Sequence, residues 1–119
     1  MLYKIADFFV KFNNHFGAML DDMKPFLSDE NKKPDIEIEI DKETVEKALN
    51  TTHKGFVKGR IEGIFFHKAL AEWLPCKDAF VFHAAAFDIE KNGIMLAALS
   101  GTGKTTLMLN FKALLGDKM

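Results

Sequence analysis

A glycine-rich segment near the end of the chain constrains the fold more than any other feature. It reads LSGTGKTTL over residues 99–107, with the apolar run Ile94–Leu99 in front and an apolar helical pattern behind. Glycines permit the turns that let backbone N–H groups converge on an anion, and the helix that follows directs its positive N-terminus to the same place. The segment therefore predicts a strand, a phosphate-binding loop and a helix.

The polar residues of this loop have the types that nucleotide chemistry needs. Counting GxxxxGK[ST] back from Lys104 places Ala98 at the first glycine position, so the match is to a relaxed form of the motif. Lys104 is expected to bridge the terminal phosphates, and Thr105 to complete the coordination of a nucleotide-bound Mg²⁺. A glycine-rich turn without a ligand is the alternative, but such a turn needs neither the lysine nor the threonine. The predicted nucleotide-binding residues are Ser100, Gly101, Thr102, Gly103, Lys104, Thr105 and Thr106.

Composition limits the classes of protein that the chain can belong to. Its 119 residues are 48% apolar, which favours a single domain with a modest core, 1–119, with parts 1–76 and 77–119. The 16 basic and 17 acidic residues nearly cancel, so no nucleic-acid surface and no polybasic membrane anchor is expected. Cys76 is the single cysteine, and no apolar run approaches the length of a membrane span. We therefore expect a cytoplasmic protein.

The first forty residues contain three predicted elements. Residues 2–12 (LYKIADFFVKF) favour a strand, although their apolar residues also fit helical spacing. Asn14 is predicted to cap a helix that ends near Pro25. The apolar face of that helix is expected to consist of Phe16, Met19, Leu20, Met23 and Leu27. Residues 35–41 (DIEIEID) alternate strictly, which predicts a half-buried strand with its four carboxylates on the solvated face rather than at a metal.

Two helices are predicted in the middle of the chain. Asp41 is placed to cap a short helix whose inward residues are Val45, Ala48 and Leu49. The next helix is expected over Arg60–Leu74, ended by Pro75, with Cys76 behaving as a small hydrophobe after it. Its predicted apolar surface consists of Ile61, Ile64, Phe65, Leu70, Trp73 and Leu74.

A β-hairpin is predicted in front of the glycine-rich loop. Asn92-Gly93 lies between two apolar runs, so the strand Ala79–Ile89 is expected to lie antiparallel to Ile94–Leu99. Pairing across a turn at 92 and 93 would place His83 opposite position 102, close to the loop. The predicted fold class is α/β with α+β character, in which a mixed sheet and an antiparallel hairpin lead into the loop and helices flank them.

The hairpin and loop together carry a family resemblance. His83 with Ala86, the Asn92-Gly93 turn, the apolar strand and LSGTGKTTL resemble the nucleotide-binding core shared by HPr kinase/phosphorylases and phosphoenolpyruvate carboxykinases. The loop looks most like that of the ATP-dependent carboxykinases, which begins with glycine where this chain has Ala98. The similarity covers about residues 78–115, and the chain upstream looks more like small HPr-kinase-related proteins.

The resemblance implies roles for particular residues. Lys104 would contact the β- and γ-phosphates of ATP, Thr105 would contact Mg²⁺ or Mn²⁺, and His83 would contact the catalytic metal or the transferred phosphoryl group. His83 and Lys104 are then the candidate catalytic residues, with a small-molecule or protein hydroxyl as acceptor. A histidine that merely caps the end of a strand is the alternative for His83.

The resemblance also identifies missing parts. In these families a second metal-holding carboxylate and an acceptor-positioning group follow the loop helix, whereas here only residues 117–119 follow the helix Thr105–Leu115 and Gly116. We therefore expect the N-terminal part of a larger domain, a naturally truncated relative, or a chain whose remaining sheet was lost. The apolar last helix is expected to be covered by a missing C-terminal segment or by another copy of the chain. The alternatives are a module that binds nucleotide or phosphate without turnover, and an interaction domain with a relic loop. ATP and GTP are not distinguished.

Overall fold

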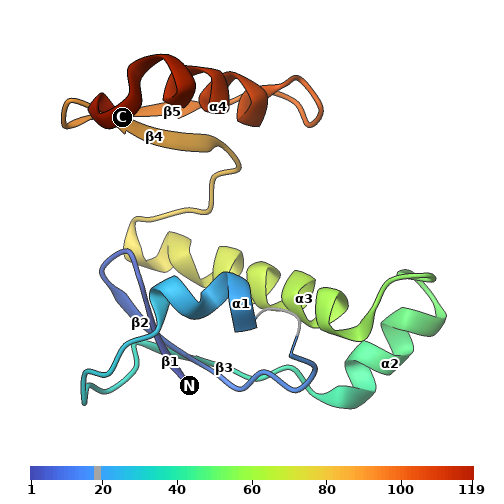
Figure 1. Cartoon of the computed structure of the whole chain (residues 1–119). Helices are drawn as coiled ribbons and strands as arrows, with labels where there is room; N and C mark the ends of the chain where they lie inside the picture. The colour runs from blue at the N-terminus through green and yellow to red at the C-terminus, as the bar shows by residue number, and fades with distance from the viewer. Residues whose placement is uncertain (18–19) are drawn as a thin grey trace. The chain divides into compact units, whose positions relative to one another are not determined.

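The computed structural model describes residues 1–17 and 20–119. The backbone contacts divide the chain into two compact units, Met1–Phe80 and Val81–Met119, which are drawn in Figure 1. Each unit combines helices with antiparallel strands, and the first contains a mixed sheet, so the α+β character is confirmed. No helix among the described residues is long and apolar enough to cross a membrane.

The first unit begins with a hairpin rather than with one strand over residues 2–12. Strand β1 (Leu2–Ile5) pairs antiparallel with β2 (Phe8–Phe12), with Ile5 opposite Phe8. Ala6 makes the turn with a φ of 53°, a left-handed conformation that alanine rarely adopts. The predicted single strand is therefore wrong, because the sequence carries no glycine or asparagine to mark the turn.

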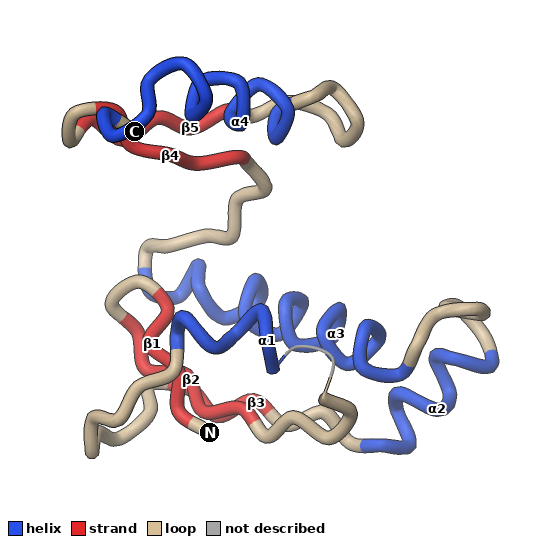
Figure 2. The backbone as a smooth tube through the Cα atoms, viewed as in Figure 1, coloured by secondary structure: helices blue, strands red, loops and turns tan. Residues whose placement is uncertain are grey.

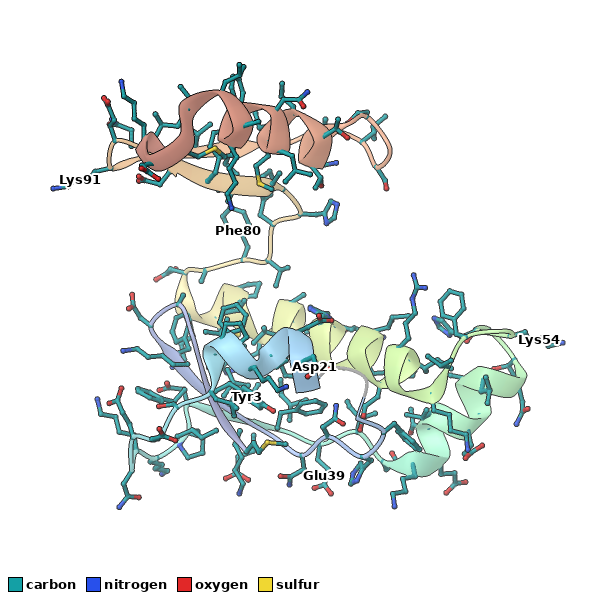
Figure 3. The ribbon with its side chains drawn as sticks, viewed as in Figure 1. Tyr3, Asp21, Glu39, Lys54, Phe80 and Lys91 are labelled. Carbon is teal, nitrogen blue, oxygen red and sulfur yellow. The ribbon has the colours of Figure 1, made fainter. Side chains whose placement is uncertain are left out.

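A third strand completes a mixed sheet. Strand β3 (Ile36–Ile38) lies parallel to β2, which gives the order β1-β2-β3 seen in Figure 2. Ile38 is buried, and the alternation predicted for this segment is confirmed. Its exposed carboxylates are those of Asp35, Glu37, Glu39 and Asp41, and Figure 3 labels Glu39 among the outward side chains.

The helix predicted from Asn14 does not begin at that residue. Residues 14–17 are not helical, whereas helix α1 spans Leu20–Met23 and continues as a 3₁₀ helix over Lys24–Phe26. The side-chain oxygen of Asn14 instead accepts a hydrogen bond from the N–H of Gly17, which closes a local turn. Met23 is buried as predicted, whereas Leu27 is 48% exposed, against prediction. The predicted position of Met19 lies outside the described residues.

Helix α2 (Lys42–Asn50) begins where the sequence places its cap. A side-chain oxygen of Asp41 accepts a hydrogen bond from the N–H of Thr44 at 2.9 Å. The side-chain hydrogen bond from the Thr44 hydroxyl lowers the pKa of Asp41, and the backbone bond adds to this effect. The cap therefore stabilises the fold above the ordinary Asp pKa and loses that contribution as the pH falls through the lowered value. Val45 and Ala48 are buried, as predicted.

Helix α3 (Lys58–Trp73) supplies most of the cover for the sheet. The rings of Phe12 in β2 and Phe66 in α3 lie with centroids 4.5 Å apart, and both side chains are fully buried. Ile64, predicted to face inward, is 37% exposed, because the buried face passes through Phe66 and Leu70. A 3₁₀ helix over Leu74–Lys77 follows, and its Cys76 is exposed rather than packed as a small hydrophobe.

A buried carboxylate joins α3 to the segment after β2. Glu62 is completely buried. Its Oε1 accepts a hydrogen bond from the N–H of His15 at 2.8 Å, and its Oε2 accepts one from the N–H of Phe16 at 3.2 Å. These two charge-assisted bonds fix residues 15 and 16 against the helix.

The second unit consists of a hairpin and one long helix. Strand β4 (Ala85–Ile89) pairs antiparallel with β5 (Asn92–Leu96), and helix α4 (Lys104–Leu115) lies along this hairpin in Figure 1. Phe87 and Phe111 join strand to helix, with ring centroids 5.9 Å apart. The hairpin forms its own two-stranded sheet, separate from the mixed sheet of the first unit. No residue of α4 is buried.

The turn of this hairpin lies two residues before the predicted position. Ile89 pairs with Asn92, so Glu90 and Lys91 make the turn, with φ values of 49° and 67°. The side chain of Asn92 donates to the carbonyls of Ile89 and Glu90, and Asp88 accepts from the N–H of Lys91 at 2.9 Å. The prediction of a turn at Asn92-Gly93 is therefore wrong, because neighbouring side chains close the earlier turn.

Replacing Lys91 with glycine is expected to stabilise the hairpin. Lys91, labelled at the hairpin tip in Figure 3, carries a left-handed conformation that costs a non-glycine residue about 1 kcal/mol. Slower amide hydrogen exchange of β4 and β5 in Lys91→Gly would report the gain. The control is Lys112→Gly within α4, which should lose about 1 kcal/mol. Faster strand exchange in Lys91→Gly would contradict the turn geometry.

Candidate phosphate-binding loop

The loop between β5 and α4 has the backbone geometry that the motif predicts. Gly101 and Gly103 adopt φ values of 81° and 88°, and Gly103 is the N-cap of α4. Residues with a side chain rarely adopt such φ values, so glycine is strongly favoured at these two positions. Ala98, at the relaxed first position, is not among the residues with positive φ. Its Cβ therefore carries no such penalty, which explains why alanine is tolerated there.

Hydrogen bonds within the loop hold two of the predicted site residues. The ammonium group of Lys104 donates to the carbonyl oxygen of Ala98 at 2.9 Å and to that of Leu99 at 3.0 Å. The hydroxyl of Thr102 donates to the same Leu99 oxygen at 2.7 Å. The lysine side chain is thus folded back across the loop, with its ammonium group on the carbonyl oxygens of the segment that follows β5.

A hollow of about 330 Å³ lies at this end of the helix. We call it the loop hollow; it is lined by His83, Ser100, Gly101, Gly103, Lys104, Thr105 and Thr106. Six of the seven predicted nucleotide-binding residues are in this lining, and Thr102 is not. The hollow combines one ammonium group, three hydroxyl groups and an imidazole with the start of a helix, which is a setting suited to an anion.

His83 reaches the loop hollow by a different route from the one predicted. Strand β4 begins at Ala85 and pairs it with Leu96, so His83 precedes the strand and does not lie opposite position 102. The predicted register is therefore wrong. His83 is exposed and lies among the residues that line the hollow.

The residues that line the loop hollow do not include a carboxylate. Across residues 1–17 and 20–119, no group of three or more His, Cys, Asp or Glu side chains is arranged to hold a metal ion. The donors that the hollow offers to a cation are the hydroxyls of Ser100, Thr105 and Thr106 and the imidazole of His83. Such a donor set fits a cation that is also held by the phosphates of a nucleotide.

Substituting Gly101 with alanine is expected to strain the loop. The φ of 81° costs a non-glycine residue about 1–2 kcal/mol, although nothing lies within 4 Å of the added Cβ. Gly93→Ala is the matched control, because its surroundings are equally open and its φ is not positive. Hydrogen exchange at the Leu107 N–H, which donates to Gly103 at 2.9 Å, should accelerate only in Gly101→Ala. Equal exchange rates in both variants would contradict the strain.

Comparison with known proteins gives no relative for this geometry. No family model matches the chain, and no curated protein or solved structure is significantly similar to it. The assignment of the candidate site therefore rests on the residues and geometry of this chain alone.

Proposed function

We propose that the chain binds ATP together with Mg²⁺ or Mn²⁺ through residues 100–106. The observation that supports this most is the loop hollow, where Lys104, Thr105 and two glycines with positive φ meet at the N-terminus of α4. Each of these features favours a polyphosphate, and a simple turn between a strand and a helix requires neither the lysine nor the threonine.

Each loop residue has a role in this proposal. Backbone N–H groups at Ser100, Gly101, Thr102 and Gly103 would surround the phosphates, and the Lys104 ammonium would neutralise the β- and γ-phosphates. Thr105 would hold the cation with its hydroxyl, and His83 would contact the cation or the outermost phosphoryl group. When bound, the cation neutralises charge on the phosphates.

Phosphoryl transfer to a hydroxyl acceptor is the activity that the resemblance to HPr kinases and phosphoenolpyruvate carboxykinases suggests. His83 and Lys104 would act on the transferred group, and a cytoplasmic location is part of the same proposal. The lining of the loop hollow favours a second candidate, a module that binds nucleotide without turnover, because it lacks a carboxylate to position an acceptor.

A calorimetric titration of the full chain with ATP in excess Mg²⁺ tests the binding. We expect saturable binding with one nucleotide per chain, and a flat titration would contradict the proposal. Incubation with ATP and Mg²⁺ or Mn²⁺, followed by measurement of released or transferred phosphate, then separates the two candidates. Binding without phosphate release would leave the non-catalytic module as the function.

A further inference from the structure

A second hollow adjoins the loop on the side of β5 and α4. Its volume is about 530 Å³, and we call it the apolar hollow. It is lined by Met95, Leu96, Ala97, Ala98, Thr102 and Leu107, together with Gly103 and Lys104, which also line the loop hollow. A ligand anchored by its phosphates at Gly103 and Lys104 would thus have its remaining atoms beside an apolar surface.

The walls of the apolar hollow are available for contact. Met95 is 60% exposed on the strand side, and Leu107 is 45% exposed on the helix side. Covering such side chains with a flat ring removes apolar surface from water, which favours binding. The volume is within the range of small-molecule sites, about 300–1,000 Å³.

The polar side chains in this lining already have hydrogen-bond partners. The Thr102 hydroxyl donates to Leu99, and the Lys104 ammonium donates to Ala98 and Leu99. Most of the residues in this lining are apolar, so a ring in the apolar hollow would be held mainly by contact with apolar side chains. Sites that bind mainly through apolar contact discriminate weakly between related ligands.

We propose that the apolar hollow holds the base of a purine nucleotide and does not distinguish adenine from guanine. This inference rests on the proposed function, because the loop hollow has to anchor the phosphates. It adds a second contact region for the ligand, from Met95 to Ala98 and at Leu107. It also predicts that the ring of the base is required for tight binding, whereas the substituents of that ring have little effect on the affinity.

Calorimetric titrations of the full chain with ATP, GTP and inorganic tripolyphosphate, each with Mg²⁺, test the proposal. We expect ATP and GTP to bind within about threefold of each other and at least about tenfold more tightly than tripolyphosphate. Equal affinity for ATP and tripolyphosphate would overturn the base site, as would a preference for one purine of more than about thirtyfold.

Substitutions in the walls of the apolar hollow test whether the base binds there. Leu107→Ala is expected to weaken ATP binding by about fivefold and to leave tripolyphosphate binding unchanged. Leu109→Ala is the matched control on the same helix, 54% exposed and outside the apolar hollow, and should change neither affinity. Met95→Ala tests the strand wall independently and should act like Leu107→Ala. Equal weakening of ATP and tripolyphosphate by both wall variants would overturn the base site.

Tripolyphosphate also separates the two proposals. If it binds in a Lys104-dependent way and ATP binds no more tightly, the base site is wrong and the phosphate site remains. If neither ligand binds, the proposed function is wrong, and this inference fails with it.

Discussion

Replacing Glu62 with alanine is expected to destabilise the first unit by about 3 kcal/mol. The Glu62 side chain is fully buried and accepts hydrogen bonds from the N–H groups of His15 and Phe16. Alanine would leave both donors without a partner and would open a cavity in α3. Urea unfolding followed by the fluorescence of Trp73, the only tryptophan of the chain, measures the loss.

Two further variants show whether the carboxylate itself is responsible. Glu62→Gln keeps one acceptor oxygen, so we expect a smaller loss than in Glu62→Ala. Glu72→Ala removes an exposed glutamate from the same helix, 3.9 Å from Lys68, and should change the unfolding free energy by less than about 0.5 kcal/mol. A Glu62→Ala protein as stable as Glu72→Ala would show that the buried hydrogen bonds do not stabilise the fold.

Replacing Lys104 with alanine is expected to weaken Mg·ATP binding by about 10- to 100-fold. A hydrogen bond to a charged group contributes about 1.5–3 kcal/mol, which corresponds to that range of affinity. Lys104 is the one lysine in the lining of the loop hollow. Calorimetric titration of both proteins with ATP and Mg²⁺ gives the ratio directly.

Two controls distinguish the effect of the Lys104 charge on ATP affinity from the effect of its side-chain packing. Lys104→Met keeps most of the apolar stem and should lose as much affinity as Lys104→Ala. Lys112→Ala removes an exposed lysine from the last turn of α4 and should leave the affinity within about twofold of the unmodified protein. If Lys104→Ala binds ATP as tightly as Lys112→Ala, the loop is not the nucleotide site.

Local chemistry explains which parts of the fold could be predicted from sequence. The alternation around Ile38, the Asp41 cap of α2 and the helix after Gly103 depend on neighbouring residues, and the structure confirms all three. The errors lie where a turn is made by residues that rarely make one, at Ala6 and at Glu90-Lys91. The pattern of residue types contains no signal at these positions.

A contact between distant residues explains another feature that the sequence did not predict. Glu62 accepts hydrogen bonds from residues 46 and 47 positions earlier, and this partnership explains why residues 15 and 16 form a fixed segment. A glutamate in a helix is ordinarily expected at the surface, so no sequence pattern indicated that Glu62 is buried. The residue types of the glycine-rich segment indicated a loop between a strand and a helix. The predicted position of His83 depended instead on the register of the hairpin, and that register changed because the turn lies two residues earlier.

The hydrogen bonds of Lys104 have a consequence for how anions reach the loop. Its partners are carbonyl oxygens, which are dipoles without net charge, so these hydrogen bonds do not neutralise the ammonium group. Solution anions will gather around that charge and must leave when a polyphosphate binds. The affinity for polyphosphate should therefore fall as the ionic strength rises, in the way that counter-ion screening weakens any exposed charge pair.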